Sequence, residues 1–148
     1  YIKNKNFNAD ISDFSYESAK FVNNFHKSFD SYEITPLVDL KNLAKEIGLK
    51  GFFVKYESYR FGLNAFKVLG ASYAIANYIK DKIGLDESNL SFDEITSSET
   101  KEKLGNITFA TATDGNHGRG VAWAANRLGQ KAVVRICLKG PLLRDLKI

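Results

Sequence analysis

The first part of the chain shows apolar residues at helical spacing. One amphipathic helix is expected over residues 12–28, with Ser12 or Asp13 as its N-cap. We interpret this helix as a cover for a larger structure. His26 is assigned to its polar side and interpreted as a surface residue without a role. The apolar stripe of the helix consists of Ala19, Val22, Phe25 and Phe29.

Segments of strand and helix character alternate in the remainder of the chain. After a second amphipathic helix, which ends at Gly48, strands are expected at residues 51–57, 107–113 and 131–137. Helices are expected at residues 67–83, 98–104 and 121–128. This alternation predicts an α/β fold with a three-layer αβα arrangement, in which helices cover both faces of a parallel sheet. The loops before residue 67 and after residue 113 are then expected at the same sheet edge, where such folds bind ligands.

Lys67 is the first candidate for chemistry. It ends a glycine-containing loop and opens a long apolar helix, with Phe66 and Val68 on either side. Apolar neighbours are expected to desolvate its amine and lower its pKa, which a nucleophilic or Schiff-base lysine requires. The alternative is a lysine whose stem lies on the core while its amine reaches water.

The loop at residues 114–120 is the second candidate. Its glycines allow the backbone to approach a ligand closely, although their spacing matches neither a dinucleotide fingerprint nor a P-loop. Asn116 provides a side-chain amide that can donate to a ring hydroxyl or phenolate, and Asp114 provides a carboxylate. Asp114 and His117 lack a Ser or Cys nucleophile beside them, so a hydrolase triad fits poorly. We interpret His117 as a wall or hydrogen-bonding residue.

Composition narrows the classes of function. The 148 residues are enough for one domain with its own core, and 21 Lys and Arg against 17 Asp and Glu, scattered along the chain, disfavour a nucleic-acid partner. One cysteine, Cys137, gives no internal disulfide, and one Cys with two His gives no metal site. No apolar run approaches the roughly 20 residues that span a bilayer, so a cytoplasmic protein without a membrane partner is expected.

The two loops together resemble a known family. A Phe-Lys pair that opens a helix at Phe66-Lys67, followed after the next strand by the Gly-Asn-His turn of residues 115–117, resembles the fold type II enzymes that depend on pyridoxal 5'-phosphate, the tryptophan synthase β family. The longer runs at residues 60–70 and 113–125 resemble the diaminopropionate ammonia-lyases within that family. The resemblance implies pyridoxal 5'-phosphate as cofactor, an amino acid as substrate and a homodimer.

The resemblance also implies roles for individual residues. Lys67 is implied to be the Schiff-base lysine, Asn116 the contact to the phenolic oxygen of the cofactor, and Asp114 the catalytic base. The implied reaction is the α,β-elimination of 2,3-diaminopropionate, with the D-isomer as the expected substrate, to pyruvate and ammonia. Related dehydratases and racemases carry a small residue in place of Asp114. Two alternatives stay open, namely a serine or threonine dehydratase on the same fold and a truncated, non-catalytic fragment of it.

The extent of the resemblance suggests a division of the chain. Residues 1–34 are expected to form a helical cover, and residues 35–148 the N-terminal part of the catalytic fold. In the family, the loop that binds the cofactor's phosphate and the partner of its pyridine nitrogen lie in the part that would follow Ile148. We therefore expect little or no stable binding of the cofactor by residues 1–148 alone.

Overall fold

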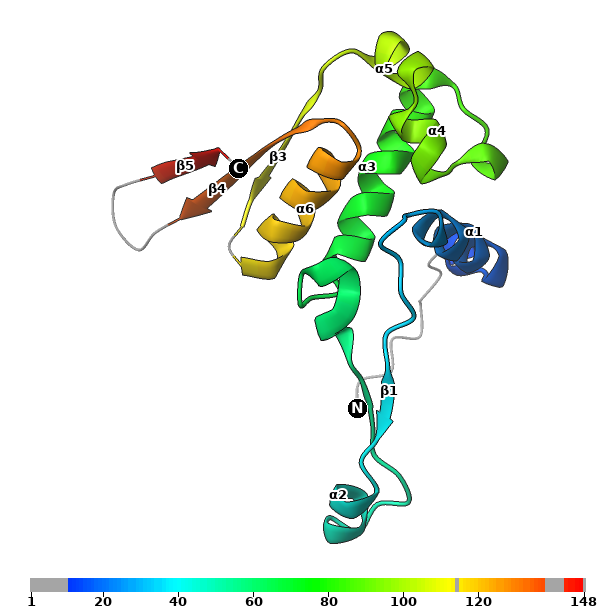
Figure 1. Cartoon of the computed structure of the whole chain (residues 1–148), viewed down its shortest axis with the longest axis vertical. Helices are drawn as coiled ribbons and strands as arrows, with labels where there is room; N and C mark the ends of the chain where they lie inside the picture. Colours follow the sequence, from blue (N-terminus) through cyan, green and yellow to red (C-terminus); the bar gives the residue numbers. More distant parts are fainter. Residues whose placement is uncertain (1–10, 114, 138–142, 148) are drawn as a thin grey trace, which may run out of the picture.

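The computed structural model describes residues 11–113, 115–137 and 143–147 (Figure 1). The α-helices are α1 (Tyr16–Lys27), α2 (Lys41–Glu46), α3 (Lys67–Ile83), α4 (Phe92–Thr96), α5 (Ser98–Leu104) and α6 (Gly115–Arg127). The 3₁₀ helices are η1 (Ser12–Phe14), η2 (Glu57–Gly62) and η3 (Glu87–Asn89). The strands are β1 (Leu37–Asp39), β2 (Phe53–Lys55), β3 (Thr108–Ala112), β4 (Lys131–Cys137) and β5 (Leu143–Lys147).

The larger sheet contains β3, β4 and β5 in that order. β3 and β4 are parallel, with Thr108 opposite Lys131, whereas β5 pairs antiparallel with β4. α6 packs on β3 and β4, and α3 packs on α6. Phe109 and Thr111 of β3 are half-buried and the other residues of that strand are exposed, so helices cover one face of the sheet in the described part of the chain. The α/β class and the parallel pairing of β3 with β4 are confirmed, but β5 makes the sheet mixed rather than all-parallel.

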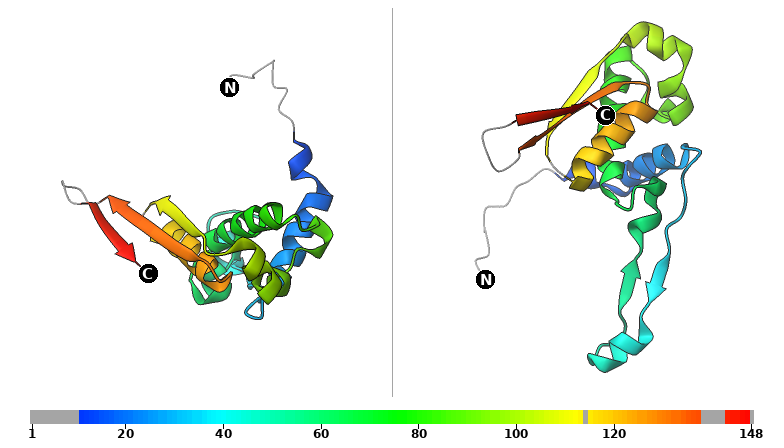
Figure 2. Two further views of the ribbon diagram at one scale, coloured as in Figure 1. Left: turned by 90° about the horizontal axis from the view of Figure 1, so that it is seen from above. Right: turned by 60° about the vertical axis from the view of Figure 1, so that its left-hand side comes forward.

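The strands β1 and β2 form a separate two-stranded antiparallel sheet, with Val38 opposite Val54. Together with α2, which follows β1 and precedes β2 in the sequence, they make an arm of residues 37–55 that projects from the helices (Figures 1 and 2). The expectation that the strand near residue 53 joins the parallel sheet is therefore wrong. Hydrophobic periodicity does not detect this ribbon because backbone hydrogen bonds hold it while most of its side chains stay exposed. In α2, only Ala44 is buried.

The central helix of the core is α3. It begins at Lys67 and ends at Ile83, as predicted, and Gly84 in the left-handed conformation closes its C-terminus. α5 and β4 also occupy the residues predicted for them. The largest fully buried apolar side chains come from three helices and from the residue that follows α6: Phe25 of α1, Ile79 and Val68 of α3, Ile95 of α4, and Leu128.

The N-terminal helix begins later than predicted. The Oγ atom of Ser15 accepts a hydrogen bond from the backbone N–H of Ser18 at 3.1 Å, so Ser15 is the N-cap of α1. Ser12, which we expected in that position, begins the short helix η1 instead. Phe25 and Phe29 bury their rings in the core that contains α3 and α6. α1 is therefore packed into the main core.

Candidate active site

Lys67 follows a turn with an unusual backbone. Phe61, Gly62 and Asn64 have positive φ angles of 48°, 69° and 56°. Glycine adopts this left-handed region freely and asparagine readily, but for phenylalanine it costs about 1–2 kcal/mol. Burial of the Phe61 ring, whose centroid lies 4.9 Å from that of Trp123, offsets this strain. Lys67 begins α3 three residues after the turn.

The side chain of Lys67 is exposed. Phe66 before it is also exposed, with 59% of its surface accessible, and Val68 after it is buried in the core. The expectation that Lys67 is partly desolvated is therefore wrong, because its side chain is exposed. An exposed amine at the start of a helix is open to small molecules and reacts as a nucleophile once it is deprotonated.

The second loop leads directly into α6, which begins at Gly115 rather than at residue 121 as predicted. Gly115 has a φ of 60°, which favours glycine. Asn116 and His117 lie in the first turn of α6 and are exposed, whereas Asp114 lies outside the described residues. The first N–H groups of a helix have no partner within it. The start of α6 therefore presents a carboxamide, an imidazole and backbone donors on one exposed turn.

A close approach of two helices brings the loops together. A Cβ atom at Gly120 would lie 3.1 Å from both the N and Cα atoms of Val68 and 3.3 Å from the carbonyl carbon of Lys67. A Cβ atom at Gly118 would lie 2.8 Å from Cγ1 of Val134 in β4. The expected shared sheet edge is wrong, because β2 and β3 belong to different sheets. Instead, the packing of α6 on the first turn of α3 brings the two loops together.

The contact at Gly120 relates Asn116 to Lys67. Asn116 lies four residues before Gly120 and thus on the same face of α6. One helical turn, with a rise of about 6 Å, separates it from the point where α6 touches the backbone of Lys67. Two of the predicted site residues therefore lie at neighbouring helix starts, and Asp114 adjoins one of them in sequence. A primary amine and a carboxamide placed in this way can hold a carbonyl compound that also carries a hydrogen-bond acceptor.

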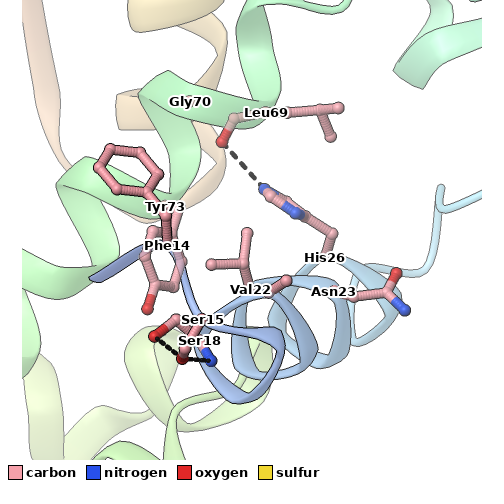
Figure 3. Close-up of a pocket in the computed structure, with 10 residues that line it drawn as sticks. Phe14, Ser15, Ser18, Val22, Asn23, His26, Leu69, Gly70 and Tyr73 are labelled. Atoms are coloured by element: carbon pink, nitrogen blue, oxygen red, sulfur yellow. Dashed lines mark hydrogen bonds between the residues drawn. The ribbon is translucent and has the colours of Figure 1, made fainter. Parts of the chain in front are cut away.

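His26 is a residue whose position the sequence analysis missed. It is 6% exposed and lies between α1 and α3 (Figure 3). Its Nε2 atom is 2.9 Å from the carbonyl oxygen of Leu69 and 3.3 Å from Oγ of Ser72. Because a carbonyl only accepts, Nε2 carries the proton. The assignment of His26 to the surface is wrong, and the sequence did contain the signal: it follows Val22 by four positions and precedes Phe29 by three, which places it on the apolar face.

An open hollow of about 550 Å³ lies beside His26, between residues 14–26, which include most of α1, and the first turns of α3. Figure 3 shows Phe14, Val22 and Tyr73 along its wall. Neither Lys67 nor Asn116 lines it. This hollow is therefore distinct from the candidate site.

Burial makes His26 a source of pH-dependent stability. Desolvation lowers its pKa below the ordinary value of 6.5. Between the lowered pKa and 6.5 the unfolded chain binds more protons than the folded one, so the free energy of unfolding decreases as the pH falls below about 6.5. We expect urea unfolding at a series of pH values to show this loss, and His26→Gln, which does not titrate, to reduce it. His117→Gln should retain the full loss, and an unchanged profile for His26→Gln would contradict the assignment.

Other classes of site find no support in the described residues. Across residues 11–113, 115–137 and 143–147, no three His, Cys, Asp or Glu side chains gather so that they could hold a metal ion. No helix in the same ranges is long and apolar enough to cross a membrane.

Comparison with known proteins identifies relatives of the chain. A family model described as pyridoxal-phosphate dependent enzyme matches residues 29–141. The diaminopropionate ammonia-lyase of Salmonella typhimurium is 52% identical over 120 residues, which make up 81% of this chain and 30% of that protein.

Solved structures agree with this similarity. The crystal structure of diaminopropionate ammonia-lyase from Escherichia coli in complex with D-serine is similar with a TM-score of 0.78 and 48% identity, over 91% of this chain and 34% of that one. The structure of the same enzyme with an aminoacrylate-PLP azomethine reaction intermediate is similar with a TM-score of 0.75 and 48% identity, over 91% of this chain and 33% of that one. The chain thus spans about a third of the length of the relatives that it matches.

Proposed function

This chain belongs to the family of pyridoxal-phosphate dependent enzymes, and on that premise we propose that it contributes the amine-bearing half of a site that eliminates ammonia from 2,3-diaminopropionate. The observation that carries the proposal is the contact of Gly120 with the backbone of Lys67 and Val68, which holds the start of α6 against the start of α3. The identity of 52% with a diaminopropionate ammonia-lyase supports this substrate class.

The side chains at these helix starts suit pyridoxal 5'-phosphate. The amine of Lys67 would hold the cofactor covalently through its aldehyde carbon, and the amide of Asn116 would donate a hydrogen bond to its phenolic oxygen. Both residues are exposed, so a planar ring has access to them. When bound, the cofactor supplies an electron-accepting ring that stabilises negative charge at Cα of the substrate.

Asp114 has two roles in the proposal. Its carboxylate takes the proton from Cα, and before that it attracts the β-ammonium group, which distinguishes diaminopropionate from a β-hydroxy amino acid. A free Asp has a pKa of about 3.9 and is a weak base, so the proton transfer depends on a substrate whose Cα has been acidified. In the balanced reaction, 2,3-diaminopropionate and one water give pyruvate and two molecules of ammonia.

Several finer features belong to the same proposal. We infer that the D-isomer is the substrate, that the enzyme is a cytoplasmic homodimer of amino-acid catabolism, and that it binds neither nucleic acid nor membranes. Residues 1–34 serve as the helical cover and residues 35–148 as part of the catalytic fold. The complex of the Escherichia coli enzyme with D-serine supports the choice of isomer. Light scattering of the purified protein tests the dimer.

The stoichiometry of the products tests the substrate class. The protein that carries this chain is supplied with pyridoxal 5'-phosphate and with the D- or L-isomer of diaminopropionate or serine, and pyruvate and ammonia are quantified. Diaminopropionate should give two ammonia per pyruvate, whereas serine can give only one. Asp114→Ala should reduce the rate with D-diaminopropionate by about 10²–10⁴-fold. Asp30→Ala, which removes an exposed carboxylate elsewhere, should leave the rate unchanged.

The possible results separate the alternatives. Faster turnover of serine than of diaminopropionate would favour a dehydratase and overturn the proposal. Unchanged turnover in Asp114→Ala would remove Asp114 from the catalytic role. Absence of pyruvate with every substrate would favour the non-catalytic interpretation.

A further inference from the structure

Arg60 lies immediately before the left-handed turn and is buried although it is charged, with 7% of its surface exposed. Its Nε donates to Oε2 of Glu57 at 2.8 Å, and its Nη2 donates to Oε1 of the same carboxylate at 3.0 Å. Its Nη1 donates to the carbonyl oxygen of Glu33 at 3.0 Å. A bidentate pair fixes the orientation of the guanidinium in addition to balancing its charge.

Thr35 completes this arrangement and is itself 2% exposed. Its Oγ1 accepts a hydrogen bond from Nη2 of Arg60 at 3.1 Å and donates one to Oε1 of Glu57 at 2.5 Å. Hydrogen bonding to Arg60 lowers the pKa of Glu57, so the carboxylate is ionised at neutral pH. We call the side chains of Thr35, Glu57 and Arg60 the clamp.

The clamp closes the base of the arm. Thr35 precedes β1, and Glu57 and Arg60 follow β2, so its bonds join the two ends of residues 35–60. The amine of Lys55 in β2 adds a further bond to the carbonyl oxygen of Thr35. These bonds therefore fix the segment that follows the arm, residues 57–60, relative to Thr35, which precedes it.

The clamp also acts on the turn. Phe61, the first residue with positive φ, is bonded to Arg60, and the guanidinium carbon lies 6.0 Å from the centre of its ring. The ring of Tyr32 lies 5.8 Å from the same carbon. The backbone N–H of Leu63 donates to the carbonyl oxygen of Arg60 at 2.9 Å. The side chain of Arg60 is thus fixed by Thr35 and Glu57, and its backbone is fixed by the hydrogen bond from Leu63 in the turn.

We propose that the clamp is a positioning device for Lys67, which holds the strained turn of residues 61–64 so that α3 begins where the lysine amine meets the cofactor. This inference rests on the proposed function. Lys67 is exposed, so its place depends on its backbone. That backbone is constrained on one side by Gly120 and on the other by the turn. Without the clamp, the turn relaxes out of the left-handed region and the start of α3 shifts.

Two substitutions of Thr35 give a matched test. Thr35→Val keeps the shape but removes the hydroxyl, whereas Thr35→Ser keeps the hydroxyl. The protein that carries this chain is incubated with pyridoxal 5'-phosphate, reduced with borohydride, and digested so that mass spectrometry quantifies attachment at each lysine. Attachment at Lys67 should slow about tenfold or more in Thr35→Val, as expected for loss of a hydrogen bond to a charged group, and stay within about twofold in Thr35→Ser. Attachment at other lysines should not change.

Amide hydrogen exchange supplies a readout that does not need the cofactor. Residues 61–68 should exchange faster in Thr35→Val, while β3 and β4 should not change. Glu57→Gln should behave like Thr35→Val, and it decides the matter if the valine variant does not fold. Glu99→Gln is the matched control, because it disrupts an exposed ion pair of similar length, 2.7 Å to Lys103, and should have no effect.

The results distinguish this inference from the proposed function. If the unsubstituted protein does not attach the cofactor preferentially at Lys67, the proposed function fails. If it does so, and both Thr35→Val and Glu57→Gln retain the same preference and the same exchange at residues 61–68, the clamp has no positioning role. Slower attachment in Thr35→Val with restoration in Thr35→Ser is the result that supports it.

Discussion

Replacing Lys67 by alanine is expected to reduce pyruvate release from D-diaminopropionate by at least about a thousandfold, since the substitution removes both a nucleophilic amine and an acid–base group. Attachment of pyridoxal 5'-phosphate at this position should disappear at the same time, as measured by borohydride reduction and mass spectrometry. The fold should persist, because the side chain of Lys67 is exposed and makes no contribution to the core.

Two further variants separate the chemistry of the amine from its charge. Lys67→Arg keeps a positive charge but has no amine that condenses with an aldehyde, so it should be as inactive as Lys67→Ala. Lys82→Ala, which removes an exposed lysine near the end of the same helix, should retain full activity. Substantial pyruvate release by Lys67→Arg would show that this lysine is not the covalent anchor.

The second large effect is expected at Gly120. In Gly120→Ala the new Cβ would lie 3.1 Å from backbone atoms of Val68, and a backbone inside a helix cannot move away as a side chain can. Overpacking of this kind costs about 1–3 kcal/mol of stability. Relief requires that α3 and α6 move apart, which would separate Lys67 from Asn116. We therefore expect a lower free energy of unfolding in urea together with slower attachment of pyridoxal 5'-phosphate at Lys67.

Gly70→Ala provides the matched control for Gly120→Ala. Gly70 also lies in a helix, but a Cβ atom there would meet nothing within 4 Å. Because alanine favours the helical conformation over glycine, this variant should be more stable by about 0.5–1 kcal/mol. If both alanine variants changed stability in the same direction, the close approach of α3 and α6 would not explain a requirement for glycine at position 120.

The sequence predicted best the elements that have local start and stop signals. The predicted bounds of α3, Lys67–Ile83, are those of the structure because an apolar period runs through them and Gly84 ends the helix in the left-handed conformation. Local start and stop signals do not show which distant segments pair with each other. Nothing local indicates that β1 pairs with β2 and leaves the main sheet, and nothing local indicates that η1 precedes the cap at Ser15.

The candidate site shows the same limit. The loops around Lys67 and Asn116 were identified from their residues, but the expected reason for their proximity was a shared sheet edge. The structure brings them together through Gly120 of α6, whose packing role becomes visible only when the facing backbone of Lys67 and Val68 is known. The burial of Arg60 and of His26 likewise involves partners that lie 25 or more residues away in sequence. These partners are Glu33 and Thr35 for Arg60, and Leu69 for His26.

The stacking of Phe61 on Trp123 gives this molecule a natural optical signal. Trp123 is the sole tryptophan of the sequence. Its ring lies 4.9 Å from that of Phe61, in the turn that leads to Lys67, and 5.8 Å from that of Phe29. The emission of an indole responds to the polarity and packing around it. The intrinsic fluorescence of the protein therefore reports on the placement of this turn, and a movement that carries Lys67 away becomes observable without a label, a substrate or a cofactor.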